Sequence, residues 1–273
     1  MNKSIHFIGI GGIGMSGLAK VLAQNGCQIT GLDQKESPLT KELESLGVII
    51  SYGDDPDFLP VSNAWVVYSS AITADHPHFK KLKSQGYHLL HRSELLQEIA
   101  KDKTFIAISG THGKTSISSL LSYVMCQLDV ETSFSIGGIL QQFETNARLK
   151  EGKYFVAEAD ESDGSFLNYK PTFAVLSNLE TEHMTHYGEE KELNKAFCDF
   201  ANSVPEPSKL LWCADCSNLR ALKLEGVSYG FEEGSDIFLS NYQQNGWELS
   251  LDLKVKNKNI KGVTILGFVS EDE

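Results

Sequence analysis

Two glycine-rich segments are the parts of this chain best suited to bind phosphate groups. The first, GIGGIG at residues 9–14, has the spacing G-x-G-x-x-G between an apolar segment at 5–8 and a helical pattern at 15–24. Glycines there allow a tight turn, and the following helix start presents free amides to a diphosphate. Asp33, at the end of the predicted strand 28–33, is placed to bond a ribose hydroxyl. The motif predicts a nucleotide or dinucleotide site without distinguishing NAD from a UDP-sugar, and a bare tight turn is the alternative.

The second segment, SGTHGKT at residues 109–115, lies between a predicted strand at 104–109 and a predicted helix at 116–127. It departs from the strict G-x-x-x-x-G-K-[ST] pattern, because only two residues separate Gly110 from Gly113. The chemistry still matches: amides surround the phosphates, Lys114 supplies a positive charge, and the Thr115 hydroxyl can bind Mg²⁺. The segment predicts a nucleoside triphosphate site, and a helix start with a solvated lysine is the alternative.

Acids and histidines follow two further apolar segments. The run EADESD at residues 158–163 comes directly after the predicted strand 154–157, and it is either a solvated loop or a metal-holding one. Glu158, the first acid after the strand, is our choice of metal ligand. After the next predicted strand, at 173–176, His183 and His186 are spaced to share a helix face. The position at a strand end favours His183 as a ligand, whereas His6, inside the first strand, is expected in the core.

These segments are connected by alternating strands and helices, which predicts parallel sheets with right-handed crossovers. A charged stretch at 101–103 predicts a domain boundary. We expect a Rossmann-like α/β domain at residues 1–101 and a P-loop ATP-binding α/β domain at 102–273, which becomes rich in strands from about residue 209. The other predicted strands lie at 48–50, 64–68, 87–90, 237–239, 247–255 and 263–266. The other predicted helices lie at 40–46, 78–85 and 93–100.

Composition limits the classes of partner. The chain has 273 residues and a formal net charge of −12, which argues against nucleic acid or an anionic membrane as its main partner. No run of 18 apolar residues is present. Glycines interrupt the apolar N-terminus, so we do not read it as a signal peptide. Five dispersed cysteines, including the C-x-x-C at 213–216, predict reduced, inert thiols in a cytoplasmic protein.

Taken together, the motifs resemble the Mur ligases of peptidoglycan synthesis. The segments that carry the resemblance occur in the family's order over nearly the whole chain. They are FIGIGGIGMSGLA (7–19), SSAI (69–72), HRSELL (91–96), SGTHGKTS (109–116), VAEADESDGSF (156–166) and SNLETEHM (177–184). GIGGIGM with EADESD favours the member of the family that joins L-alanine to UDP-N-acetylmuramate.

The resemblance implies an ATP-dependent, amide-forming ligase that uses Mg²⁺ and forms an acyl-phosphate intermediate. It implies that the first glycine segment binds a UDP-sugar rather than NAD, with Lys114 and His183 in catalytic roles. The implied UDP-sugar residues are Gly11, Gly12, Ile13, Gly14, Met15, Asp33, Ser70, Ala71 and Ile72. The implied ATP residues are Gly110, Thr111, His112, Gly113, Lys114, Thr115, Ser116 and Asn178. The implied magnesium ligands are Thr115, Glu158 and His183.

The chain departs from the family in two places. Glu182-His183-Met184-Thr185 stands where the family has Asp-His-Met-Asp. The family also continues beyond the predicted strand 263–266 into a third domain, so we expect this chain to be truncated. Three alternatives follow: an inactive fragment that binds UDP-sugar and ATP, a ligase that adds a peptide to UDP-muramate, and an NAD-dependent dehydrogenase, in which the second segment would have no role.

Overall fold

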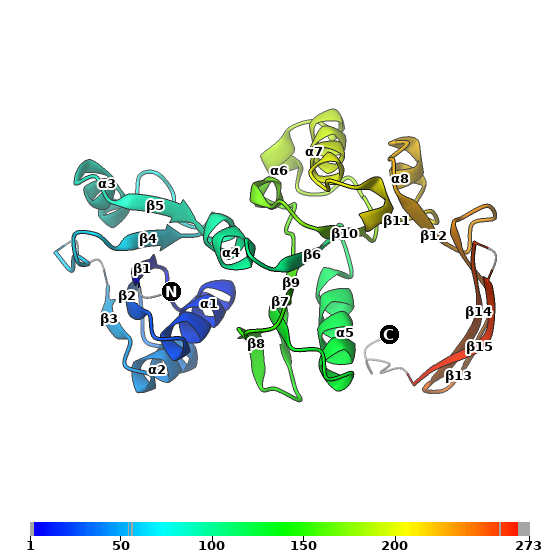
Figure 1. The fold of residues 1–273 in the computed structure, drawn as a ribbon. Helices are drawn as coiled ribbons and strands as arrows, with labels where there is room; N and C mark the ends of the chain where they lie inside the picture. Colours follow the sequence, from blue (N-terminus) through cyan, green and yellow to red (C-terminus); the bar gives the residue numbers. More distant parts are fainter. Residues whose placement is uncertain (1–2, 54, 56, 257, 267–273) are drawn as a thin grey trace.

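The computed structural model describes residues 3–53, 55, 57–256 and 258–266, and it contains two sheets (Figure 1). Sheet A has the strand order β3-β2-β1-β4-β5 and is parallel throughout. Its strands are β1 (Ser4–Ile8), β2 (Gln28–Asp33), β3 (Ile49–Tyr52), β4 (Trp65–Tyr68) and β5 (His88–His91). Its helices are α1 (Ile13–Gln24), α2 (Pro38–Ser45), α3 (Pro77–Ser84) and α4 (Arg92–Ala100). We call sheet A with these helices lobe A.

Sheet B has ten strands in the order β15-β14-β13-β12-β11-β10-β6-β9-β7-β8. Its central strands are parallel, whereas β8 and the three strands of the far edge form antiparallel pairs. The strands are β6 (Thr104–Ser109), β7 (Thr132–Leu140), β8 (Thr145–Arg148), β9 (Tyr154–Glu158), β10 (Phe173–Leu176), β11 (Leu210–Cys213), β12 (Val227–Gly230), β13 (Ile237–Asn245), β14 (Glu248–Val255) and β15 (Lys258–Leu266). The helices are α5 (Lys114–Gln127), α6 (Met184–Tyr187), α7 (Glu190–Asn202) and α8 (Ser217–Ala221). We call this part lobe B.

The two-residue period of the strands explains how helices cover both faces of each sheet. In β1, Phe7 belongs to the core on the side of α1 and α4, whereas its neighbour Ile8 packs with Phe79 of α3 on the opposite face. In lobe B, Phe134 and Val156 pack with residues of α5. The predicted α/β class, with a strand-rich end, is therefore confirmed.

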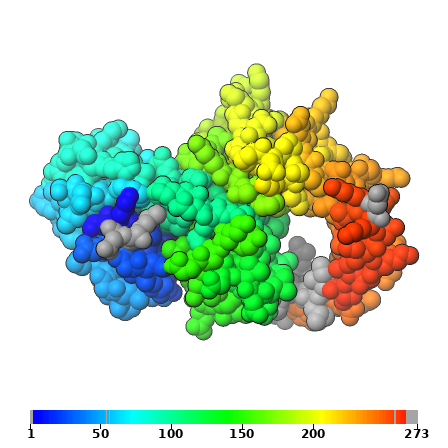
Figure 2. Space-filling view, viewed as in Figure 1, coloured from blue at the N-terminus to red at the C-terminus, as the bar shows by residue number. Residues whose placement is uncertain are grey.

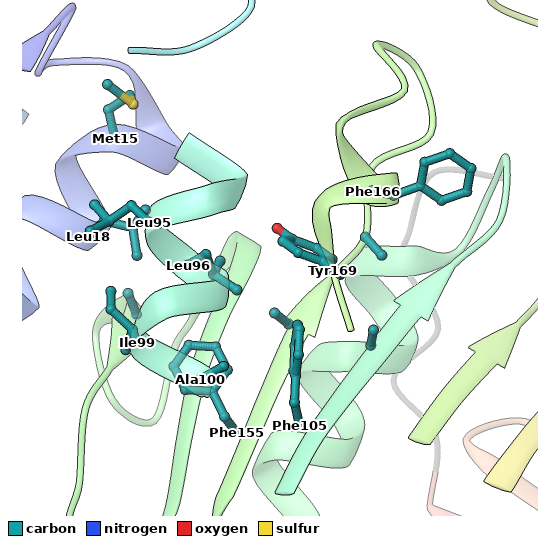
Figure 3. Close-up of a cluster of buried hydrophobic side chains, with 14 of the residues drawn as sticks. Met15, Leu18, Leu95, Leu96, Ile99, Ala100, Phe105, Phe155, Phe166 and Tyr169 are labelled. Carbon is teal, nitrogen blue, oxygen red and sulfur yellow. The ribbon is translucent and has the colours of Figure 1, made fainter. Parts of the chain in front are cut away.

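One buried cluster continues from lobe A into lobe B. Figure 3 shows Leu18 of α1 beside Leu95 of α4, and Ile99 and Ala100 of α4 near Phe155. Phe105 and Phe155 are directly paired across β6 and β9, with their rings edge to face. Figure 2 shows the blue-to-cyan lobe A in direct contact with the green part of lobe B. Because α4 belongs to both cores, separating the lobes would expose apolar surface. The predicted division of the chain into domains at residues 101 and 102 falls at this junction and stays a prediction.

Several predicted boundaries shift for local reasons. Helix α5 begins at Lys114 rather than at residue 116, because Gly113 adopts a left-handed conformation (φ 79°) as its N-cap. Helix α2 begins at Pro38, where Ser37 and Thr40 form reciprocal capping hydrogen bonds. The segment after residue 209 also contains the short helix α8. Within the described ranges, no helix combines the length and apolar character that crossing a bilayer requires.

His6 is a core residue, as predicted, with 0% of its surface exposed. Its Nδ1 lies 2.8 Å from Thr30 Oγ1, and its Nε2 lies 3.0 Å from His78 Nε2 of α3. Burial, and then the proximity of His78, lower the pKa of His6 from 6.5 to about 3. The imidazole is therefore neutral in the folded protein at neutral pH.

We predict that His6 makes the fold acid-sensitive. Between pH 6.5 and 3 the unfolded chain binds a proton at His6 and the folded chain does not, so stability falls as the pH falls through this window. Replacing His6 with Leu should reduce the slope of unfolding free energy against pH by up to about 1.4 kcal/mol per pH unit. Urea unfolding between pH 7.5 and 5.5 measures this slope. His88→Gln, on the exposed part of β5, is the control, and equal slopes in both variants would contradict the prediction.

Candidate active site

The second glycine segment forms a phosphate-type loop at the carboxyl edge of sheet B. The loop connects β6 to α5. Asn178, two residues after the end of β10, holds the loop in place through two hydrogen bonds. The His112 amide donates to Asn178 Oδ1 (2.7 Å), and Asn178 Nδ2 donates to the His112 carbonyl oxygen (3.0 Å). Gly110 has φ 142°, and a β-carbon there would lie 2.0 Å from Ser177 Oγ. The loop thus requires glycine at this point, and the start of α5 leaves amides free for an anion.

Lys114 is not solvated, as it would be in the alternative interpretation of a plain helix start. Its side chain is 15% exposed, and Nζ lies 2.8 Å from Glu161 Oε2 and 2.7 Å from the Gly110 carbonyl oxygen. Glu161 is 1% exposed. Burial raises the pKa of Glu161, and the charge of Lys114 only partly offsets this. The ammonium group is therefore held over the loop by a buried carboxylate.

Thr115 and Glu158 converge on one point beside the loop. A β-carbon built on Gly137 of β7 would lie 2.9 Å from Glu158 Oε2 and 3.1 Å from Thr115 Oγ1. Glu158 Oε1 accepts hydrogen bonds from the Gly137 amide (2.5 Å) and from Ser118 Oγ (3.2 Å), which orients the carboxylate. A hydroxyl and a carboxylate around a space kept open by glycine are a donor set that suits Mg²⁺.

His183 has a different environment from the one its spacing suggested. It precedes α6 with a left-handed backbone (φ 56°), so it does not share a helix face with His186, and that expectation is wrong. Its Nε2 lies 3.7 Å from Glu161 Oε1, a buried atom with no hydrogen-bond partner among the described residues. His183 is 39% exposed and can therefore bring a ligand atom to this carboxylate from the solvent side.

The first glycine segment forms a tight turn between β1 and α1. Gly9 has φ 76°, and the Gly11 amide donates to Asp33 Oδ2 (2.7 Å). Asp33 thus holds the turn closed with one oxygen. A cavity of about 350 Å³ lies beside it. Its lining includes Gly9, Gly12, Met15, Asp33, Ala71 and Ile72.

A second cavity of about 350 Å³ lies between the lobes. Lobe A lines it with Gly12, Ile13, Gly14, Met15, Ser70 and Ala71, and lobe B with Glu158, Asp160 and Asp163. The cavity therefore brings the predicted UDP-sugar residues and one predicted metal ligand to a common space. Among the predicted UDP-sugar residues, Gly11, Asp33 and Ile72 do not line it.

Sequence comparison gives matches over both lobes. Residues 4–104 match the Mur ligase family catalytic domain, and residues 108–267 match the Mur ligase middle domain. The chain belongs to the Mur ligase family. It is 39% identical over 266 residues to a UDP-N-acetylmuramate–L-alanine ligase of Protochlamydia amoebophila, covering 97% of this chain and 58% of that protein. The enzyme of the same name from Carboxydothermus hydrogenoformans is 38% identical, with 93% and 56% covered. The chain thus spans little more than half the length of these relatives.

Solved structures agree on the fold of this Mur ligase. A UDP-N-acetylmuramate:L-alanyl-γ-D-glutamyl-meso-diaminopimelate ligase from Neisseria meningitidis superposes with a TM-score of 0.82 at 26% identity, covering 95% of this chain and 86% of that one. A UDP-N-acetylmuramate–alanine ligase from Thermotoga maritima gives a TM-score of 0.81 at 23% identity, with 97% and 60% covered. The predicted resemblance to the family is therefore confirmed.

Sequence reasoning missed two residues of this site. The sequence did not distinguish Glu161 from the other acids of the EADESD run, and its place in that run was the only sign of a role in the site. Gly137 lies on β7, which was not predicted at all. The pair of glycines at 137–138, in a segment otherwise suited to a strand, was the available signal for a close approach of other atoms.

We predict that Lys114 stabilises the fold as well as the site. Lys114→Met leaves Glu161 buried without its partner, which should lower the unfolding free energy by about 3 kcal/mol. The double variant Lys114→Met with Glu161→Gln removes both charges and should recover most of that loss. Urea unfolding at pH 7.5 measures both values. If Lys114→Met alone is as stable as the wild type, the ion pair is not part of the folded protein's stability.

Proposed function

We propose that this chain carries the sugar-nucleotide and ATP sites of an enzyme that joins L-alanine to UDP-N-acetylmuramate. The proposed reaction converts ATP, UDP-N-acetylmuramate and L-alanine into ADP, phosphate and UDP-N-acetylmuramoyl-L-alanine. The observation that carries the proposal is the cavity between the lobes, which the first glycine turn lines on one side and Glu158 on the other. The identity of 38–39% to enzymes named for this reaction supports the same choice.

In this proposal, the domain at residues 1–101 binds the sugar nucleotide and the domain at residues 102–273 binds ATP. The amides at the start of α1 face the diphosphate of the sugar nucleotide, and the loop from Gly110 to Ser116 surrounds the phosphates of ATP. Lys114 places its charge over that loop, 2.7 Å from the Gly110 carbonyl oxygen. Thr115 and Glu158 would hold Mg²⁺, and His183, beside Glu161, would hold a second ion. When bound, magnesium neutralises phosphate charge.

The chemistry we propose has two steps. The muramate carboxylate attacks the γ-phosphate of ATP, which gives an acyl phosphate and ADP. The amine of alanine then displaces phosphate and forms the amide bond. The contribution of this chain's residues to the first step is to position the two reactants and to balance their charge, which can lower the barrier by several kcal/mol.

A second candidate reaction is the addition of a peptide to UDP-N-acetylmuramate. The Neisseria meningitidis structure, whose name describes a peptide substrate, matches 95% of this chain. The two candidates share the sugar nucleotide and ATP and differ in the amine. Phosphate release by the chain, measured with L-alanine or with L-alanyl-γ-D-glutamyl-meso-diaminopimelate, separates them. We also propose a cytoplasmic location, which the odd, dispersed set of five cysteines in the sequence supports.

We predict that Gly12→Val abolishes binding of UDP-N-acetylmuramate and leaves Mg-ATP binding within about twofold of the wild type. Gly12 has φ −63° and ψ 144°, which valine adopts without strain, and a β-carbon there meets no protein atom closer than 3.6 Å. The new side chain therefore fills space meant for ligand rather than disturbing the fold. Gly14 is a poorer choice, because a β-carbon there would lie 2.5 Å from Arg92 Nη1.

Calorimetric titration of the wild type and of Gly12→Val with UDP-N-acetylmuramate and with Mg-ATP measures the two affinities. NAD serves as the control ligand. Loss of both ligands in Gly12→Val would contradict the separation of the two sites. Saturable binding of NAD without binding of UDP-N-acetylmuramate would instead support a dehydrogenase.

A further inference from the structure

A chain of side-chain hydrogen bonds joins the end of sheet A to the loop after β9. Asn168 Nδ2 donates to Ser93 Oγ (2.7 Å), which lies 2.7 Å from His91 Nδ1. His91 Nε2 lies 2.9 Å from Ser70 Oγ, and Ser70 donates to Asp163 Oδ2. Ser70, His91 and Ser93 belong to lobe A, and Asp163 and Asn168 to lobe B. This series of hydrogen bonds therefore joins lobe A to lobe B at each of its two ends.

Only one placement of protons satisfies every member of this chain. The Ser93 amide points at His91 Nδ1 (3.3 Å), so Nδ1 carries a lone pair and accepts the Ser93 hydroxyl proton as well. The proton of the neutral imidazole is then on Nε2 and is donated to Ser70 Oγ. The Ser70 hydroxyl in turn donates to the Asp163 carboxylate. His91 is thus fixed as the neutral Nε2–H tautomer.

The surroundings of His91 favour this neutral form. His91 is 9% exposed and Ser93 is 0% exposed. Burial lowers the pKa of His91, and Arg92 lowers it further, whereas the nearby carboxylates of Asp163 and Glu94 oppose the shift. The ring of Tyr68, on β4, packs edge to face against the imidazole. For Asp163, burial opposes ionisation, but hydrogen bonds from Ser165 and Ser70 outweigh it and lower the pKa.

Ser70 and Asp163, which form the last hydrogen bond of this series, also line the cavity between the lobes. Ser70 lies among the first glycine turn's neighbours on one wall, and Asp163 lies with Glu158 and Asp160 on the other. The hydrogen bond between Ser70 and Asp163 therefore connects the two walls directly, in addition to the core that the lobes share. His91 has no other role in the proposed mechanism; it does not line this cavity, but its ring is hydrogen-bonded to Ser70, which does.

We propose that His91 is a positioning residue, which in its Nε2–H form holds Ser70 against Asp163 and so brings the sugar-nucleotide wall and the acidic wall of the cavity together. The proposal rests on the proposed function for the identity of the ligand, though not for the closure itself. Protonation of Nδ1 would cost the Ser93 amide its acceptor but would leave the Nε2–H donor to Ser70 in place. Closure, and with it sugar-nucleotide affinity, should therefore depend on the Nε2–H donor rather than on the charge of the ring.

Two isosteric variants separate positioning from packing. His91→Gln places an amide N–H near the position of Nε2 and can still donate to Ser70. His91→Asn retains an acceptor near Nδ1 for Ser93 and lacks the donor. We expect His91→Asn to weaken UDP-N-acetylmuramate binding by about threefold to tenfold, the effect of one lost hydrogen bond, and His91→Gln to stay within about twofold of the wild type. Mg-ATP affinity should not change, and His88→Gln on the same strand is the control.

Calorimetry at pH 7.5 and 5.5 gives the affinities, and small-angle X-ray scattering of the ligand-free protein gives the separation of the lobes. The wild type and His91→Gln should have similar affinities and the same lobe separation at both pH values, because both keep a donor to Ser70. His91→Asn should be expanded at both pH values. Equal effects of Asn and Gln, or no effect of either on lobe separation, would overturn the positioning role. A wild type that fails to bind UDP-N-acetylmuramate, with the scattering as expected, would overturn the proposed function alone.

Discussion

The buried charge of Glu161 is the constraint around which the candidate site is arranged. A carboxylate with 1% of its surface exposed is costly unless it has a partner, and Lys114 is that partner at 2.8 Å. Lys114 can reach it because Gly113 starts α5 with a left-handed turn, which directs the first helical side chain back over the loop. The Tyr187 hydroxyl also donates to the Glu161 carbonyl oxygen, which ties the end of α6 to the acidic loop. One ion pair thus links the phosphate-type loop, the acids after β9 and the segment that contains His183.

The second constraint is that the lobes share a core without sharing a sheet. Helix α4 contacts β4 and β5 of sheet A and the short turn Ser165–Asn168 of lobe B. Its Leu96 and Ile99 belong to the same buried cluster as Phe155 of β9, as Figure 3 shows. On the opposite side of α1, the β7–β8 hairpin contributes Asn146, whose Nδ2 donates to the Ile13 carbonyl (2.9 Å). Gly17 leaves the space for this side chain, since a β-carbon there would lie 2.7 Å from Asn146 Oδ1. The cavity between the lobes is therefore bounded by packed contacts on two sides.

The sequence predicted the architecture well because parallel strands impose a simple rule. Loops after β6, β9 and β10 meet at one edge of the sheet, so the strand pattern alone predicts Glu158 near the glycine loop, whereas Asn178 was implied only by the family resemblance. The inward turn of Glu161 was not predictable in the same way, because a run of acids carries no sign of which side chain becomes buried. Strand β7 was missed because serines and glycines interrupt its apolar alternation. His183 was placed in a helix, since spacing alone does not reveal a left-handed residue.

The contacts of Glu182, which stands where the family has an aspartate, give this difference a physical meaning. Its Oε1 lies 3.5 Å from His112 Nε2 in the phosphate-type loop, and its Oε2 lies 3.9 Å from His183 Nε2. One carboxylate therefore touches a residue of the loop after β6 and a residue beside Glu161. An aspartate at this position would have one methylene less with which to reach both rings. The longer side chain thus connects the loop to the histidine segment across an exposed gap, in addition to the buried connection through Glu161.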